Sequence, residues 1–183
     1  TDGELILVLD CDHVPTSDFL TRTFEYFLAD PKLFLVQTPH FFINPTPIEK
    51  NLETHRHSPH ENEMFYGAVQ LGLDLWNSAF FCGSAALLRR SALMHIGGMA
   101  RDTVTEEAET SLALHSRGYN SIYLNKPMSM GLSPESFEGF ILQRSRWAQG
   151  MTQIMLLKNP LGRKGLKVSQ RVCYFNLCLF WFF

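Results

Sequence analysis

Short runs of consecutive hydrophobic residues alternate along this chain with longer segments in which hydrophobic residues recur every three or four positions. The short runs are typical of strands buried on both faces of a sheet, and the longer segments are typical of helices. The predicted strands are 5–9, 33–36, 79–82, 85–88 and 121–124, and the predicted helices are 19–28, 61–75, 105–118 and 133–157. This alternation predicts one α/β domain with a mostly parallel sheet.

Several boundaries of these elements are marked by residues that begin or end helices. Asp30-Pro31 should end the first helix, because proline disfavours a helical backbone in the residue before it. Gly118 is a typical C-terminal stop for the third helix. Ser133-Pro134-Glu135 predicts the start of the fourth, with a serine cap, a proline in the first turn and an acid that suits the helix dipole. We expect the proline-rich segment 39–59 to be a surface loop without helix or strand.

The C-terminal residues 172–183 are nearly all hydrophobic. A membrane-spanning helix needs about 20 such residues, so this segment resembles the start of one that continues beyond the sequence. Basic residues just before it favour a cytosolic approach to a membrane. They are Arg163, Lys164, Lys167 and Arg171. We therefore expect residues 161–183 to be a basic interfacial segment and the start of a transmembrane helix, with a buried C-terminal core helix as the alternative.

Composition and charge narrow the class of protein. Hydrophobic residues make up 45% and charged residues 19% of the 183 residues, which excludes a disordered tail. The formal net charge of -2 gives no basic footprint for nucleic acid, so we expect no nucleic-acid partner. The cysteines include no C-x-x-C pair, and we predict neither a disulfide framework nor a zinc site. They are Cys11, Cys82, Cys173 and Cys178.

The first candidate site is Asp10-Cys11-Asp12, directly after the first predicted strand. In open α/β sheets, ligands bind outside the carboxyl ends of the strands. Two carboxylates two residues apart can share one Mg²⁺, which prefers carboxylates together with substrate phosphates. The alternative is structural, because such acids also cap helices and solvate turns.

The second candidate is the acidic segment Thr105-Glu106-Glu107-Ala108-Glu109. Taken alone it is more typical of a helix start, since threonine is a good cap and acids in the first turn suit the helix dipole.

The third candidate is one face of the last predicted helix. Gln143, Arg146, Trp147 and Gly150 share this face at helical spacing. A guanidinium can bind phosphate, an indole can stack on a sugar ring, an amide can bind hydroxyls, and glycine leaves room beside them. The alternative is an ordinary amphipathic helix with the tryptophan in the core.

The fourth candidate is a segment rich in metal-ligand residue types, 55–63, which holds three histidines and two glutamates. Its spacing does not place a third ligand beside a helical histidine pair, and Pro59 interrupts it. A polar surface loop is favoured over a zinc site.

Taken in order, these motifs resemble those of the processive family 2 glycosyltransferases, and among them the bacterial cellulose synthases. The family carries a D-x-D, a T-E-D and a Q-x-x-R-W, which match Asp10/Asp12, Thr105-Glu106-Glu107 and Gln143 to Trp147. Three longer stretches share the resemblance, which covers nearly the whole chain. They are 36–44, 61–67 and 80–84.

The resemblance implies a GT-A-like fold, with residues 1–160 as the C-terminal part of the glycosyltransferase domain. It implies that Asp10 and Asp12 contact UDP and Mg²⁺, or Mn²⁺ in its place, and that Glu107 is the catalytic base. It also implies that Gln143, Arg146 and Trp147 bind the acceptor end and the diphosphate. The residues implied to bind substrate near the growing glucan are His40, Met64, Phe65, Tyr66, Phe81, Cys82, Gly83 and Ser84.

The resemblance further implies processive, inverting transfer of glucose from UDP-glucose to the 4-hydroxyl of a growing β-1,4-glucan. The catalytic domain would lie on the cytosolic side of the bacterial inner membrane, in contact with the lipid bilayer and with an accessory periplasmic membrane-anchored subunit. Cyclic di-GMP would activate the full-length protein through a domain outside this sequence, and the isolated fragment is expected to be inactive.

The chain departs from the family pattern at one position, Glu107, where the family has aspartate. This departure leaves open a catalytically impaired homologue. A related polymerase that makes a different β-linked polysaccharide also stays open, as does a D-x-D phosphohydrolase.

Overall fold

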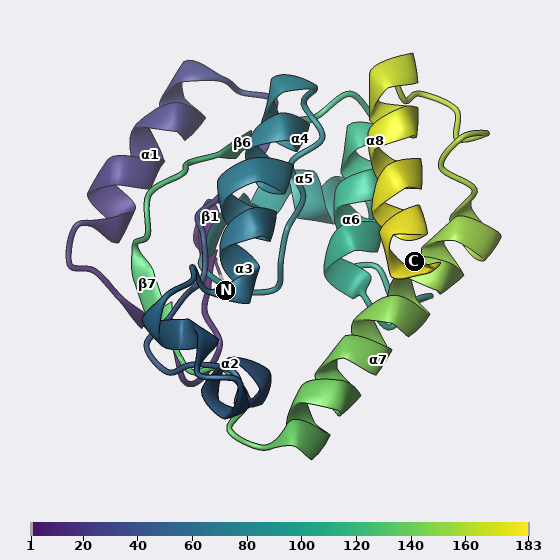
Figure 1. Ribbon diagram of the computed structural model, residues 1–183. Helices are drawn as coiled ribbons and strands as arrows, with labels where there is room; N and C mark the ends of the chain where they lie inside the picture. The colour runs from purple at the N-terminus through teal and green to yellow at the C-terminus, as the bar shows by residue number, and fades with distance from the viewer. Residues whose placement is uncertain (1, 183) are drawn as a thin grey trace.

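The computed structural model describes residues 2–182 as an α/β fold built on two sheets (Figure 1). The main sheet has the strand order β1-β5-β3-β6. Its strands are β1 (Leu5–Val8), β5 (Ala86–Arg89), β3 (Leu33–Gln37) and β6 (Asn120–Tyr123). Strand β5 pairs antiparallel with β1 and β3, whereas β3 and β6 run parallel. The prediction of a mostly parallel sheet is therefore wrong, because the sheet is mixed.

The wrong prediction of strand direction has a physical reason. An unbroken hydrophobic run indicates that a strand is buried on both faces, but it does not indicate whether the neighbouring strands run parallel or antiparallel to it. The predicted strand 79–82 is also wrong, since these residues form an irregular segment that leads into β5. Side chains satisfy its backbone there: Phe81 N–H donates to Ser111 Oγ (2.9 Å), and Cys82 N–H donates to Gln37 Oε1 (2.9 Å).

A small second sheet and a short helix occupy the region around the expected loop. The sheet has the order β2-β7-β4, with β2 (Val14–Pro15), β7 (Ser129–Gly131) and β4 (Phe41–Phe42). Helix α2 (Pro47–Asn51) and the 3-10 turn η1 (Thr54–Arg56) follow β4. The expectation that 39–59 holds no element is wrong. These elements are too short for periodicity, but the capping box of Thr46 and Glu49 marks the start of α2.

The predicted helix 61–75 is present as a continuous helical segment. It consists of α3 (Glu61–Met64), the π-helical η2 (Phe65–Gln70) and α4 (Leu71–Leu75). The other helices are α1 (Phe19–Ala29), α5 (Arg90–His95), α6 (Glu106–His115), α7 (Phe137–Gln153) with the π-helical η3 (Ile154–Lys158), and α8 (Val168–Leu179) with the 3-10 turn η4 (Phe180–Phe182).

Helix α7 begins three residues later than predicted. Ser136 caps it by accepting a hydrogen bond from Gly139 N–H (3.1 Å). Ser133 is engaged elsewhere, because its N–H and hydroxyl both bond to Asn44 at 2.8 Å. A long-range partner therefore overrides the local start signal.

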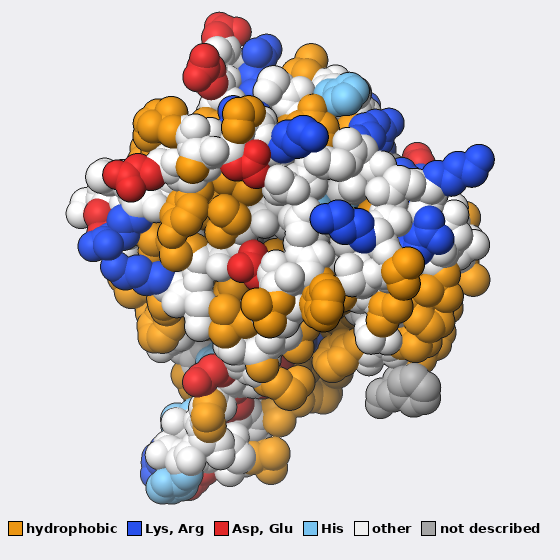
Figure 2. Space-filling view, turned by 90° about the horizontal axis from the view of Figure 1, so that it is seen from above, with side chains coloured by type: hydrophobic (Ala, Val, Ile, Leu, Met, Phe, Trp, Pro, Cys, Tyr) orange, Lys and Arg blue, Asp and Glu red, His pale blue; other side chains and the backbone are white. Residues whose placement is uncertain are grey.

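Helices cover both faces of the main sheet. On one face, Phe19 and Phe27 of α1 pack with Val36 and Leu87. On the other face, Leu93 of α5 and Leu114 of α6 pack with Leu35 and Leu88. Seen from above in Figure 2, hydrophobic side chains are exposed in several patches, and many of the Lys and Arg side chains gather on one side.

Helix α8 packs into the core beside α6 and α7. Tyr174 and Cys178 are fully buried in a cluster with Leu112 of α6 and Met151 of α7. The Tyr174 hydroxyl lies 2.7 Å from Nδ1 of His115. Among residues 2–182, no helix has both the length and the hydrophobicity needed to cross a bilayer. The expected start of a transmembrane helix thus has no support here, and the alternative of a buried core helix describes the packing of α8.

Candidate active site

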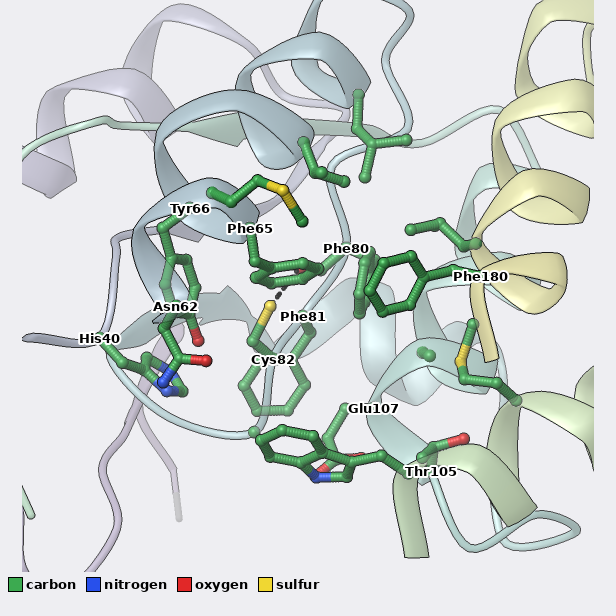
Figure 3. Close-up of a pocket in the computed structure, with 18 of the residues that line it drawn as sticks. His40, Asn62, Phe65, Tyr66, Phe80, Phe81, Cys82, Thr105, Glu107 and Phe180 are labelled. Carbon is green, nitrogen blue, oxygen red and sulfur yellow. Dashed lines mark hydrogen bonds between the residues drawn. The ribbon is translucent and has the colours of Figure 1, made fainter. Parts of the chain in front are cut away.

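A cavity of about 690 Å³ lies between the helical segment 61–75, the irregular segment before β5, and helices α6, α7 and α8. It brings together twelve residues expected at the site from the sequence. They are Asp10, Asp12, His40, Met64, Phe65, Tyr66, Phe81, Cys82, Gly83, Glu107, Gln143 and Trp147. Figure 3 shows Glu107 and Thr105 on one side of this cavity and the aromatic rings of Phe65, Phe80 and Phe180 on another.

Ser84 does not line the cavity and instead holds Asp10 in place. Its Oγ accepts a hydrogen bond from the N–H of Asp10 (2.8 Å). Its carbonyl accepts hydrogen bonds from Gln37 Nε2 (2.8 Å) and His40 Nε2 (2.9 Å). Burial lowers the pKa of His40 to about 4, so the ring is neutral at pH 7 and donates from Nε2. Gln37 is fully buried, and it was not expected at the site from the sequence. The feature that could have indicated it is the position of a polar glutamine at the end of a hydrophobic strand.

The Glu107 carboxylate comes from the first turn of α6 and meets the backbone of Gly83. A Cβ atom at Gly83 would lie 2.8 Å from Glu107 Oε1, and the φ of +90° also favours glycine there. Burial raises the pKa of Glu107, and the charges of Glu106 and Asp10 raise it further, while Arg146 lowers it. A carboxyl group with a raised pKa in a cavity suits general acid–base chemistry.

Asp10, Asp12 and His13 form a cluster with the chemistry of a cation site. One ligand atom from each residue lies within 4.8 Å of the others. His13 Nδ1 is 3.3 Å from a carboxylate oxygen of Asp12 and 3.8 Å from one of Asp10. Gly131 makes room for the imidazole, since a Cβ there would lie 2.6 Å from the ring. Two carboxylates fit Mg²⁺ or Mn²⁺, and the neighbouring imidazole adds a ligand that was not expected from the sequence.

Helix α7 turns only part of the expected face to the cavity. Gln143 and Trp147 line it, but Arg146 is exposed and is not among the lining residues. Arg144 lines the cavity in its place. The space beside Gly150 does not receive a ligand, because a Cβ there would lie 2.4 Å from the Thr105 side chain. The glycine therefore brings α7 against the start of α6.

Helix α8 and turn η4 supply a wall of the cavity that sequence reasoning missed. Cys173, Asn176, Leu177, Phe180 and Trp181 line it. The indole of Trp181 meets that of Trp147 edge to face, with 6.2 Å between ring centroids. Phe65 and Phe80 pack in the same manner at 6.0 Å. This end of the cavity presents the flat hydrophobic surfaces on which sugar rings stack.

The fold and the site are those of a sugar-transferring enzyme, and comparison with protein families identifies which family. Residues 5–183 match the glycosyl transferase family group 2, so the chain belongs to this family. The chain is 55% identical over its whole length to the UDP-forming cellulose synthase catalytic subunit of Pseudomonas fluorescens (strain SBW25). It is 51% identical over 99% of its length to that of Xanthomonas axonopodis pv. citri (strain 306). The chain spans 25% of the length of each relative.

These relatives confirm the resemblance drawn from the sequence motifs, as a part of the glycosyltransferase domain. The fold is similar to that of a mannosyltransferase from Pyrobaculum calidifontis, solved in complex with GDP-Man and Mn²⁺. The TM-score is 0.72 at 19% identity, over 97% of this chain and 45% of that chain. The expected GT-A-like glycosyltransferase fold is thereby confirmed.

Proposed function

We propose that the full-length protein transfers glucose from UDP-glucose to the 4-hydroxyl of a growing β-1,4-glucan, processively and with inversion at the anomeric carbon. One observation carries this proposal: Glu107, with its raised pKa, shares a cavity with the carboxylates of Asp10 and Asp12. The Glu107 carboxylate suits the deprotonation of an acceptor, and the two aspartates suit the binding of a metal ion with a diphosphate. The similarity to UDP-forming cellulose synthases supports the choice of sugar donor.

In this proposal Asp10 and Asp12, with His13 beside them, would hold a divalent cation, Mg²⁺ or Mn²⁺, that binds the donor. When bound, the cation would neutralise charge on the diphosphate leaving group. The similar mannosyltransferase fold was solved with Mn²⁺ and a nucleotide sugar, which supports this choice of ligands. The hydrogen bond from Asp10 N–H to Ser84 fixes the backbone at the start of the motif.

Glu107 acts as the general base in the transfer step. Its carboxylate accepts the proton of the acceptor 4-hydroxyl while that oxygen forms a bond to the anomeric carbon. The bond from the anomeric carbon to the diphosphate oxygen breaks, and UDP leaves with that electron pair. Attack from the face opposite UDP inverts the anomeric centre, so a single carboxylate is sufficient.

The acceptor glucan would bind along the aromatic side of the cavity, with its terminal sugar against Trp147 and Gln143. The cavity lining, which includes His40, Tyr66, Phe80 and Phe81, would give such a chain several contacts. Arg146 is exposed, and its charge lowers the pKa of Glu107, so it would bind the diphosphate of a donor held near that carboxylate. In this proposal the aromatic side chains bind the glucan acceptor, and the charged Arg146 binds the diphosphate of the donor.

The remaining expectations concern the full-length protein. We propose that it works on the cytosolic side of the bacterial inner membrane, with residues 161–183 next to the bilayer and an accessory periplasmic subunit as partner. Activation by cyclic di-GMP would require parts of the protein beyond this sequence. Because the chain spans 25% of its relatives, we expect no polymer synthesis from the isolated fragment.

The test uses the full-length enzyme in membrane vesicles supplied with radiolabelled UDP-glucose and Mg²⁺. We expect a labelled polymer that β-1,4-glucanase digests, and its loss in Glu107→Gln. A polymer that resists this glucanase would indicate a related polymerase with another linkage. Release of sugar or phosphate without any polymer would contradict the proposal and favour a hydrolase.

A further inference from the structure

Arg144 connects two opposite walls of the cavity. It lies on α7, and its guanidinium forms an ion pair with the carboxylate of Glu61 at the start of α3. The same guanidinium lies 3.5 Å from Oδ1 of Asn62. The Arg144 and Glu61 side chains are 27% and 30% exposed, so the pair is screened less than a surface ion pair. The bridge ties the helix that carries Gln143 and Trp147 to the helical segment that carries Met64, Phe65 and Tyr66.

Arg144 also lies against two aromatic rings of α7, one of which is the indole that lines the cavity. Its guanidinium carbon lies 5.0 Å from the centroid of the Trp147 ring and 5.1 Å from that of Phe140. Contacts of this kind between a cation and an aromatic ring are attractive and depend on the ring's orientation. The planar fork of arginine can bind a carboxylate and stack on a ring at the same time, which the ammonium group of lysine cannot do.

The neighbouring Arg146 has a different environment. It is exposed, whereas Arg144 is partly buried and lines the cavity. Within residues 2–182, the Nε atom of Arg144 is buried and has no hydrogen-bond partner, so the guanidinium is held by its terminal nitrogens and by ring contacts. Two arginines in one motif therefore face different surroundings, and only one of them contacts Trp147.

We propose that Arg144 is a positioning residue for sugar transfer, which holds the Trp147 indole and the start of α3 in the arrangement that receives the acceptor. This inference rests on the proposed function of the cavity. It places Arg144 on the acceptor side, so that loss of the bridge impairs transfer to the glucan and leaves the binding of UDP unchanged. Glu61 acts through Arg144 and shares its effect.

The experiment compares Arg144→Gln, Glu61→Gln and the double variant in the full-length enzyme, with Glu63→Gln as the matched control. Glu63 is an exposed glutamate in the same helix. For each variant, polymer synthesis is measured from UDP-glucose, and UDP affinity is measured from product inhibition. A misplaced acceptor group costs on the order of tenfold to 100-fold in rate. We expect a fall of at least about tenfold in synthesis by both single variants, with UDP inhibition within about twofold of the parent.

Three further results decide the inference. The double variant should be no slower than the slower single variant, because both changes remove one bridge. If both singles synthesise polymer at the parental rate, or if UDP affinity falls in step with the rate, the inference is overturned. Should Arg144→Gln fail to fold, the comparison of Glu61→Gln with Glu63→Gln gives the same decision. A parent enzyme that makes no glucan would instead contradict the proposed function.

Discussion

The carboxylate of Glu107 occupies the space that any side chain at position 83 would need. A Cβ atom on Gly83 would lie 2.8 Å from Oε1 and 3.6 Å from the carboxyl carbon of Glu107. The two residues lie on different elements, the segment before β5 and the first turn of α6. The absence of a side chain at Gly83 thus allows the proposed base to approach the backbone of the opposite wall.

We predict that Gly83→Ala reduces sugar transfer strongly. The new methyl group would displace the Glu107 carboxylate, and the φ of +90° would be strained in any other residue, at a cost of about 1 kcal/mol or more in the free energy of unfolding. Polymer synthesis and thermal stability of the full-length enzyme measure the two effects. The matched control is Gly67→Ala, where a Cβ would meet its nearest neighbour at an ordinary 3.8 Å. Equal activity in the two variants would show that Glu107 does not need this space.

We predict that Glu107→Gln abolishes elongation, with a loss of about 100-fold or more, because a general base contributes this much. The same change should leave the folded protein as stable as the parent or more so. Burial raises the pKa of Glu107, so the ionised carboxylate opposes folding at neutral pH, and an amide removes that cost. Polymer synthesis and thermal denaturation at pH 7 test the two parts. Normal elongation in Glu107→Gln would place the base elsewhere.

The pH dependence of transfer should reflect the same carboxyl group. The base works only when ionised, and burial, followed by the charges of Glu106 and Asp10, raises the pKa of Glu107 against the opposing charge of Arg146. Activity should therefore be lost, as pH falls, at a higher pH than the ordinary pKa of glutamate would give.

We predict that Glu107→Asp keeps or increases the activity, since the motif that this segment resembles has aspartate at this position. If the parent makes no polymer and Glu107→Asp does, the chain belongs to an impaired enzyme.

The motif residues of the site were predictable because their chemistry is local in sequence. Asp10 follows a hydrophobic run that leads to the edge of the sheet, and Glu107 begins a helix. The role of Gln37 was not predictable, because its partner Ser84 lies 47 positions away. Strand direction was missed for a similar reason, since it depends on pairing between distant segments.

The face of α7 shows which side chain helical periodicity did not single out, since Arg144 lines the cavity together with Gln143 and Trp147. Grouping Gln143, Trp147 and Gly150 on one face favoured Arg146 as their neighbour. Neighbouring residues on a helix differ by about 100°, and the cavity is lined by Arg144 and Met151 beside Trp147. Periodicity gave the correct helix but could not fix the direction in which its arginines point, because partners such as Glu61 decide it.

We predict that Asp12→Asn weakens the binding of Mn²⁺ and makes UDP binding independent of divalent cations. An amide oxygen is a weaker ligand for a hard cation than a carboxylate, because it carries no negative charge. Binding of Mn²⁺ to the full-length protein, measured by electron paramagnetic resonance in the presence of UDP, tests this without activity. Asp18→Asn is the control, since this exposed carboxylate pairs with Arg22 on α1. Unchanged Mn²⁺ binding by Asp12→Asn would exclude the cluster as the cation site.

The third acid of the segment, Glu109, has a structural environment unlike that of Glu107. It is 5% exposed, and its Oε2 accepts hydrogen bonds from Asp102 N–H (3.2 Å) and Thr103 N–H (3.0 Å). Its Oε1 lies 2.7 Å from Nζ of Lys158, which also pairs with Asp102. These contacts hold the loop before α6 against η3, and so place the proposed base relative to α7.

We predict that Glu109→Gln lowers the free energy of unfolding by about 1–3 kcal/mol, because the uncharged amide leaves the Lys158 ammonium with Asp102 as its remaining acidic partner and accepts the loop N–H bonds less strongly. Glu106→Gln is the matched control on the same helix turn, and its exposed side chain should change stability by no more than about 0.5 kcal/mol. Thermal unfolding of the solubilised full-length enzyme measures both variants. At a temperature where Glu109→Gln is folded, its polymer synthesis should still be reduced, since the loop before Glu107 is no longer held. If Glu106→Gln proves the more damaging variant, the three acids have been assigned to the wrong faces of α6.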